Sequence, residues 1–159
     1  MCVMFVDRYG CLPVGFHLMT WEDVLKNFSF SPRRNMLLMK MELILQILKK
    51  CGCEYLYIDG SFVTDKLEPG DIDAFFSIKE GADLDVIYGS MIKEEPLLMC
   101  TQNNRKLQKE KYGCELFYEN WVAFCDENGN SVKYIDFFQQ LRGFDGIKKG
   151  IVKIDIQAL

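Results

Sequence analysis

Residues 60–73 read GSFVTDKLEPGDID, and this stretch decides the fold. It joins two segments, 54–59 and 72–78, that are rich in Tyr, Phe, Leu and Ile, and such composition favours strands. Between them, Glu68-Pro69-Gly70 is a combination typical of a turn. The stretch therefore predicts two core strands, with a tight turn at Gly60-Ser61 and two acids at the start of the second strand.

Helices are expected before these strands. Thr20 has an acid three positions later, the arrangement of a helix N-cap, which predicts a helix to about residue 27. Ser31-Pro32 opens a second helix, whose apolar residues recur every three or four positions up to Lys49-Lys50. After the second strand, we expect helices over 81–91 and 94–111. A strand is expected over 114–118 or extending through 121–124, followed by an Asn-Gly hairpin turn over 126–130. The remaining ordered segments are expected over 132–138 and 151–156.

The alternation of helices and strands predicts an α/β (α+β) fold, with a mixed β-sheet and helices packed against it. At 159 residues, the chain is long enough for one core and too short for two, so we expect a single domain over residues 1–159. Met1–Val6 is apolar but short, and it predicts an ordered edge segment rather than an export signal.

The composition excludes several classes of protein. With 49% apolar and 26% charged residues and a net charge of −4, the chain is expected to fold. The mild acidity argues against a protein that coats a phosphate backbone, and the basic run from Arg105 to Lys111 is interpreted as the solvated face of a helix. The longest apolar stretch, 36–48, is interrupted by Lys40 and Glu42, so no segment is expected to span a membrane.

The seven cysteines are odd in number and scattered, which predicts reduced thiols and a cytoplasmic protein. Cys51-Gly52-Cys53 lacks the spacer and the second pair of a metal site, so it is interpreted as two small buried residues between a helix and a strand. His17 stands apart from any candidate nucleophile, and we expect it to pack.

The two acids of the central stretch suggest chemistry. In a strand, Asp71 and Asp73 point to the same face, and neighbouring carboxylates repel unless a cation or a proton neutralises them. Paired Asp oxygens are ligands that Mg²⁺ or Mn²⁺ accepts. Gly60 lets the backbone approach a ligand, and Ser61 offers a hydroxyl to phosphate oxygens. The alternative is a polar entry into a strand.

The same residues resemble the polymerase-beta-like (minimal) nucleotidyltransferase superfamily. Its hallmark is a hydrophobic residue, Gly, then Ser or Gly, a spacer of nine to thirteen residues, and Asp-hydrophobic-Asp or Glu. This chain has Gly60-Ser61, nine residues, and Asp71-Ile72-Asp73; Asp59 departs from the hydrophobic position. The wider chain is similar to a small bacterial and phage branch of the superfamily, in Gly10-Cys11-Leu12-Pro13, Thr20, Arg33-Arg34, Phe137-Phe138-Gln139 and Lys149-Gly150-Ile151-Val152.

The resemblance implies a nucleotidyltransferase-like fold and a site with two metal ions, Mg²⁺ or Mn²⁺, on three carboxylates. It implies that Asp71, Asp73 and Glu115 are the catalytic metal ligands, with Glu115 in place of the more usual Asp of a later strand. Asp136 is the rival third ligand, although it can instead be the N-cap of a last helix. Nucleotide binding is expected at Gly60, Ser61 and Lys66; Lys66, Arg33 and Arg34 either contact a triphosphate or are solvated.

Two hypotheses about function follow. In the first, the protein is a metal-dependent nucleotidyltransferase that moves a nucleoside monophosphate from a nucleoside triphosphate to a protein, RNA or small-molecule acceptor. In the second, it is a catalytically weak or inactive member of that fold, such as an antitoxin or a defence-system component, that binds a protein partner or a nucleotide. A nucleic-acid-binding module is the weakest alternative, because it depends only on the basic run before residue 112.

Overall fold

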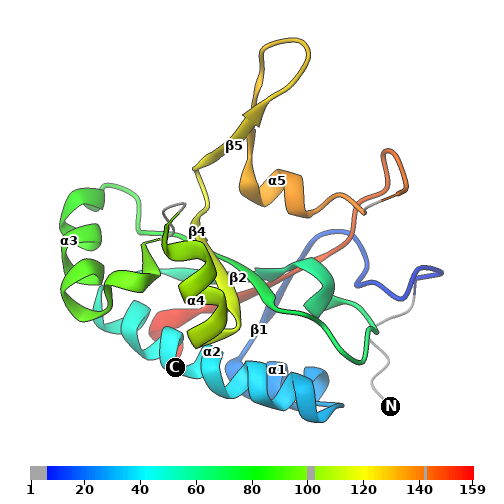
Figure 1. Ribbon diagram of the computed structural model, residues 1–159, viewed down its shortest axis with the longest axis horizontal. Coiled ribbons are helices and arrows are strands. Elements are labelled where there is room, and N and C mark those ends of the chain that lie inside the picture. Colours follow the sequence, from blue (N-terminus) through cyan, green and yellow to red (C-terminus); the bar gives the residue numbers. More distant parts are fainter. Residues whose placement is uncertain (1–6, 100–102, 142) are drawn as a thin grey trace.

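The computed structural model describes residues 7–99, 103–141 and 143–159. Figure 1 shows its helices and strands, which are β1 (Phe16–Met19), α1 (Trp21–Phe28), α2 (Pro32–Lys50), β2 (Tyr55–Asp59), β3 (Ile72–Phe76), α3 (Leu84–Glu94), α4 (Asn104–Tyr112), β4 (Cys114–Tyr118), β5 (Val122–Cys125), β6 (Ser131–Lys133), α5 (Tyr134–Phe138) and β7 (Ile151–Asp155). Short 3-10 turns lie at Gly60–Val63, Pro96–Leu98 and Ile156–Ala158.

Five strands form one mixed sheet in the order β1-β7-β2-β3-β4. β7 runs parallel to β1 and antiparallel to β2, β2 is antiparallel to β3, and β3 is parallel to β4. The expected α/β class is thus confirmed. β5 and β6 make a separate hairpin. Since β7 pairs with both β1 and β2, the two ends of the chain share the central sheet.

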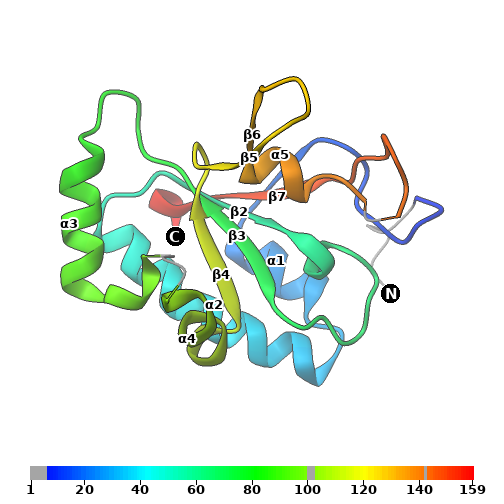
Figure 2. The same cartoon turned by 45° about the horizontal axis from the view of Figure 1, so that its top comes forward.

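The two faces of the sheet differ in their cover. In strands, alternate residues point to opposite faces. Leu56 and Ile58 of β2, with Ala74 of β3, pack into the core formed with the apolar stripe of α2. Figure 2 shows α1 and α2 on that side and α5 with the β5–β6 hairpin on the other. Tyr57 and Phe75 point to this second side, where the cover is thinner.

The predicted helices near the N-terminus are confirmed, and their caps explain why. Thr20 and Asp23 form a capping box at the start of α1. The Ser31 hydroxyl accepts a hydrogen bond from the Arg34 amide at the start of α2, where Pro32 occupies the first position. Cys51 and Cys53 are buried between α2 and β2, as expected. No disulfide joins the described cysteines, which are Cys11, Cys51, Cys53, Cys114 and Cys125.

Other expectations were wrong. The helix predicted over 94–111 does not form as one piece, because Glu95 precedes Pro96 and takes an extended backbone, φ −156° and ψ 97°. Asp136 is not an N-cap, since α5 begins earlier, after Lys133.

β1 was not expected from the sequence. The edge segment predicted at Met1–Val6 lies outside the described residues.

No helix within the described ranges is long and apolar enough to cross a bilayer.

Arg33 and Arg34 hold the loop between β2 and β3. Arg34 is fully buried, and its guanidinium donates to the carbonyl oxygens of Phe62 at 2.9 Å, Thr64 at 2.6 Å and Lys66 at 2.9 Å. Burial lowers the pKa of Arg34 to about 10, and the nearby Asp65 opposes that effect. Arg33 donates to the carbonyl of Pro69 at 3.1 Å and to that of Gly70. Both arginines therefore position the stretch that carries the candidate site.

Replacing Arg34 by Met is expected to destabilise the protein by about 3 kcal/mol or more, because three loop carbonyls lose a buried donor. Urea denaturation followed by circular dichroism measures this change. Arg33→Met is the matched control. The Arg33 side chain is only partly buried, so water can replace it, and we expect a loss of about 1 kcal/mol. Equal and small losses in both variants would contradict the role of Arg34.

Candidate functional site

Four carboxylates gather on the face of the sheet that lies below α5. Asp73 of β3 is directly opposite Asp59 of β2 on one side and Glu115 of β4 on the other. Residues that are opposite one another in neighbouring strands point to the same face. Asp71, two positions before Asp73, joins them, since one lysine contacts both Asp71 and Glu115. We call these four residues the acidic row. The structure therefore brings together Asp71, Asp73 and Glu115, and adds Asp59.

Gly60 allows Asp73 of the acidic row to pack directly against the backbone of the turn. Its φ of +73° is favourable only for glycine. A Cβ atom at this position would lie 2.0 Å from Oδ2 of Asp73, a distance that no packing allows. The Gly-Ser turn and the second acid of the central stretch are thus in direct contact, which explains why they occur together.

Asp59 is buried against Lys149. Its side chain is fully inaccessible, Oδ1 lies 3.2 Å from the Lys149 ammonium, and the same oxygen accepts from the Gly60 amide at 2.7 Å. Lys149 also donates to the Gly60 carbonyl at 2.8 Å. Oδ2 of Asp59 has no hydrogen-bond partner in the described part of the chain. Burial raises the pKa of Asp59 to about 7, although Lys149 acts to lower it. The family pattern has a hydrophobic residue at position 59. This chain has an acid there, whose carboxylate holds the Gly60 turn together with Lys149.

Lys109 and Arg105 of α4 reach the opposite end of the acidic row. The Lys109 ammonium lies 2.6 Å from Oδ2 of Asp71 and 3.1 Å from Oε1 of Glu115, and Arg105 donates to Oε2 of Glu115 at 2.8 Å. Burial acts to raise the pKa of Glu115, but hydrogen bonds from Arg105 and Lys109 outweigh it and lower the pKa. The interpretation of this basic run as a solvated face was wrong for these two residues.

Asp73 is the acid without a direct cation. Within the described segments it makes no ion pair, whereas Asp59 and Asp71 each have one and Glu115 has two. Burial raises the pKa of Asp73 to about 6, and the charges of Asp71 and Glu115 add to this. The middle of the row therefore favours an additional positive charge or a proton.

A cleft of about 850 Å³ opens above the acidic row. Its polar floor includes Gly60, Ser61, Asp71, Asp73, Glu115 and Lys149. Its opposite wall is aromatic and comes from β5, α5 and the loop after α5, with Phe124, Tyr134, Phe137, Phe138 and Phe144. A cleft of this size, with an apolar wall and a few charged groups, is typical of a small-molecule site.

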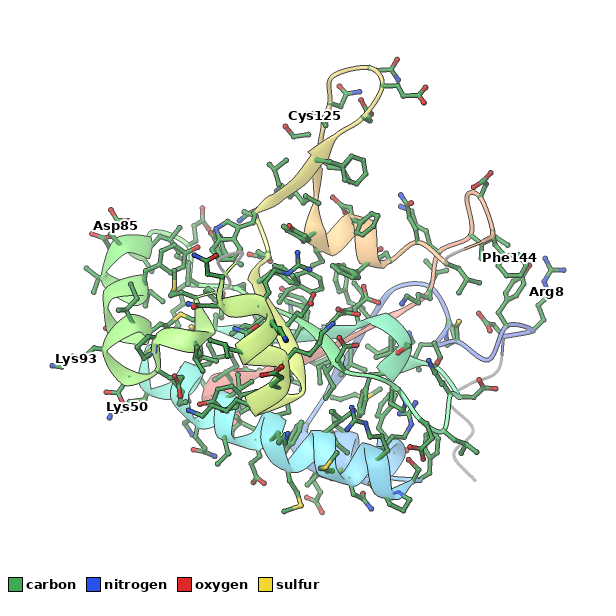
Figure 3. All side chains as sticks on the ribbon, viewed as in Figure 1. Arg8, Lys50, Asp85, Lys93, Cys125 and Phe144 are labelled. Atoms are coloured by element: carbon green, nitrogen blue, oxygen red, sulfur yellow. The ribbon has the colours of Figure 1, made fainter. Side chains whose placement is uncertain are left out.

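The aromatic wall is anchored to the same two strands as the acids. Phe117 and Phe75 each lie two positions after an acid, so they point to the same face. Tyr134 stacks on Phe117, with ring centroids 4.2 Å apart, and Phe138 contacts Phe75 at 5.7 Å. Phe144 packs against Tyr9 at 4.9 Å, beside the segment that carries Arg8 in Figure 3. Aromatic contacts therefore hold the wall above the acids.

The other predicted residues occupy different places. Ser61 lies in the cleft floor and is half-buried, and Lys66 lies exposed at the cleft. Asp136 is exposed on α5 and does not line the cleft, so the structure does not bring it to the acidic row. His17 contacts the Pro13 carbonyl at 2.7 Å through Nε2, which fits the packing role expected for it.

The carboxylates of the acidic row are the right kind of ligand for a divalent cation, but their side chains are not arranged to bind one. Carboxylate oxygens are the ligands that Mg²⁺ and Mn²⁺ prefer. As the side chains stand in the described residues, no three of Asp, Glu, His or Cys converge closely enough to hold a metal ion. The ammonium group of Lys109 occupies the space between Asp71 and Glu115, so a metal ion would have to displace it.

Comparison with known proteins identifies the family. The model of a family of unknown function, DUF6932, matches residues 4–155. The chain belongs to this family. No curated protein and no solved structure matches the chain. The DUF6932 match includes every residue of the acidic row and of the cleft, so both lie within the family's domain.

Sequence reasoning missed three cations of this DUF6932 site, and their signals were weak. Arg105 and Lys109 are four positions apart, which places them on one face of α4. That face also carries Tyr112, which is buried, so the run was not uniformly solvated. Lys149 was noted only as part of Lys149-Gly150-Ile151-Val152, which gave it no role in the site. The acid at position 59, where an apolar residue was expected, was the signal that a buried cation was needed.

The raised pKa of Asp73 predicts a loss of stability as the pH rises. The folded-state pKa is about 6, against about 3.9 in an unfolded chain, so the folded protein holds this proton more tightly. The contribution is complete below pH 4 and is lost between about pH 4 and 6, up to about 3 kcal/mol. Asp73→Asn stays neutral, so it is expected to melt about 5–10 °C above the wild type at pH 8, with a difference that shrinks as the pH falls and vanishes below about pH 4. Thermal melts with a chelator present test this.

Exposed Asp136→Asn is the control for that experiment. If the melting difference between Asp73→Asn and the wild type did not change with pH, the pKa of Asp73 would not be raised in the folded protein.

Proposed function

We propose that this protein is a metal-dependent nucleotidyltransferase that moves a nucleoside monophosphate from a nucleoside triphosphate to a protein, RNA or small-molecule acceptor. The observation that carries the proposal is the meeting of Gly60-Ser61 with Asp71, Asp73 and Glu115 in one cleft. These are the residues that the resemblance to polymerase-beta-like nucleotidyltransferases marks. The nucleotidyltransferase-like fold is part of the same proposal, supported by the position of Glu115 on the strand beside Asp73.

The chain's own residues suit a triphosphate. At Gly60 the backbone has no side chain, and Ser61, which carries a hydroxyl, lines the cleft beside it. Lys149, which is nearly buried beside this turn, supplies a fixed positive charge, and Lys66 supplies a mobile one at the cleft. Preorganised positive charges stabilise the charge on phosphate oxygens without reorganising during the reaction.

Asp71, Asp73 and Glu115 would hold Mg²⁺ or Mn²⁺. When bound, the metal would neutralise phosphate charge and stabilise the attacking and leaving oxygens of an in-line transfer. Asp73 is the central ligand in this proposal, since it lacks another cation in the described part of the chain and lies next to both other acids. Arg105 stays on the outer oxygen of Glu115 and orients that side chain.

The aromatic wall supports a nucleotide rather than an inorganic phosphate. Phe124 is 45% exposed, and its ring lies edge-on to Phe137 with centroids 5.5 Å apart. A planar base can stack on an exposed aromatic face, and each stacked base contributes about 1–3 kcal/mol. The cleft thus offers charged groups for phosphates on one side and aromatic rings for a base on the other.

A catalytically weak or inactive partner, such as an antitoxin or a defence-system component, is the second candidate. The observation that favours it is the ion pairing of Asp71 and Glu115 with Lys109 and Arg105, which neutralises two of the acids without a metal. A toxin encoded beside this chain would support the partner role, and turnover by the isolated chain would exclude it.

We place this function in the cytoplasm. No disulfide joins the described cysteines, and a reducing compartment keeps thiols in that state.

Asp71→Asn and Asp73→Asn are each expected to reduce nucleotide transfer by at least 100-fold, because each removes a charged ligand at the phosphates. The assay incubates the purified protein with cell lysate, labelled nucleoside triphosphates and Mn²⁺, and follows the label on acceptors. Asp136→Asn makes the same chemical change outside the cleft and is expected to keep full activity. Labelling that persists unchanged in both cleft variants would end the catalytic proposal.

Phe124→Ala is expected to weaken nucleoside triphosphate binding about 5- to 50-fold, because a stacking surface is lost. Binding of inorganic tripolyphosphate should not change, since it has no base. Isothermal titration with both ligands measures the two effects. Phe16→Ala removes another exposed ring, which lies outside the cleft, and should leave both affinities unchanged. A parallel loss for tripolyphosphate would assign Phe124 a role in folding the cleft instead.

A further inference from the structure

One lysine contacts two of the three acids that are proposed to hold the metal. The Lys109 ammonium lies 2.6 Å from Oδ2 of Asp71 and 3.1 Å from Oε1 of Glu115. Both carboxylates direct an oxygen at one positive charge, as they would towards a bound cation. The group that joins them here belongs to the chain itself.

The lysine is the movable member of this cluster. The side chain of Lys109 is 46% exposed, whereas those of Asp71 and Glu115 are 19% and 10% exposed. A lysine on the surface of a helix can turn its long side chain into water at little cost, and its charge stays solvated. The two carboxylates are less exposed than the lysine, with Asp71 directly before β3 and Glu115 within β4. Exchange of the cation is therefore easier than rearrangement of the acids.

The other positive groups do not compete in the same way. Arg105 donates to Oε2 of Glu115, whereas Lys109 lies against Oε1, so Arg105 can remain when that lysine leaves. Lys149 is buried beside Asp59 and holds the Gly60 turn. Only Lys109 among these three joins two of the proposed ligands.

We propose that Lys109 is an internal competitor of the divalent cation, and that metal binding to Asp71, Asp73 and Glu115 displaces its ammonium group into solvent. This inference rests on the proposed function, which makes those three acids metal ligands. Without metal, the lysine keeps two of the acids paired and the fold stable. With metal, the three carboxylates converge, which they do not do as the described side chains stand.

The inference predicts that Lys109→Met binds Mn²⁺ roughly tenfold more tightly than the wild type, because the metal no longer has to break an ion pair. Mn²⁺ binding to the whole chain is measured by electron paramagnetic resonance of the free ion, without nucleotide and at low salt. Lys106→Met is the matched control. It removes the same charge from the same helix, but Lys106 is 86% exposed and, among the described residues, pairs with Glu110 alone, so the affinity of this variant should equal that of the wild type.

Lys109→Arg, which keeps the charge, should bind Mn²⁺ no more tightly than the wild type, and circular dichroism checks that each variant is folded. If Lys109→Met does not fold, Lys109→Gln replaces it with the same expected gain. Equal Mn²⁺ affinities in the wild type and Lys109→Met, or weaker binding by the variant, would overturn the inference and leave the metal site standing. Binding by neither protein would overturn both the inference and the metal-dependent function.

Discussion

Repulsion between like charges on neighbouring strands is the constraint on which the rest of the structure depends. Asp59, Asp73 and Glu115 are opposite one another across three strands, an arrangement that is unfavourable by itself. The fold compensates at both ends, with Lys149 against Asp59 and two basic residues of α4 against Glu115. The middle acid has no such partner in the described segments. A fold that keeps this arrangement gives up stability for a site that attracts positive charge.

Arg34 has a different task from the basic residues that pair with the acidic row. Arg34 is as deeply buried as any core residue, yet its contacts are carbonyl oxygens of the loop after β2, and none is a carboxylate of the site. A planar guanidinium suits this task, because it donates in several fixed directions at once. The frame of the site is therefore maintained by groups that do not take part in its charge balance.

The central stretch allowed much of the site to be predicted, because its spacing reflects a direct contact. Gly60 and Asp73 touch, so a glycine at one end and an acid at the other follow from the same geometry. Caps and apolar periodicity were sufficient for α1 and α2, where local signals and packing agree. The basic residues of α4 could not be placed in this way. Whether a lysine on a short helix faces water or a carboxylate depends on the strand that follows, and a single sequence does not contain that relation.

The position of β7 has a consequence for the order in which the protein can assemble. This strand, near the end of the chain, lies between β1 and β2, both of which emerge from the ribosome much earlier. Until residues 149–155 are synthesised, β1 has no neighbour among the described strands of the sheet, and the carboxylate at position 59 lacks the ammonium that accompanies it in the interior. A nascent chain must therefore keep that region open to water, and the whole sheet can close only when its last strand arrives.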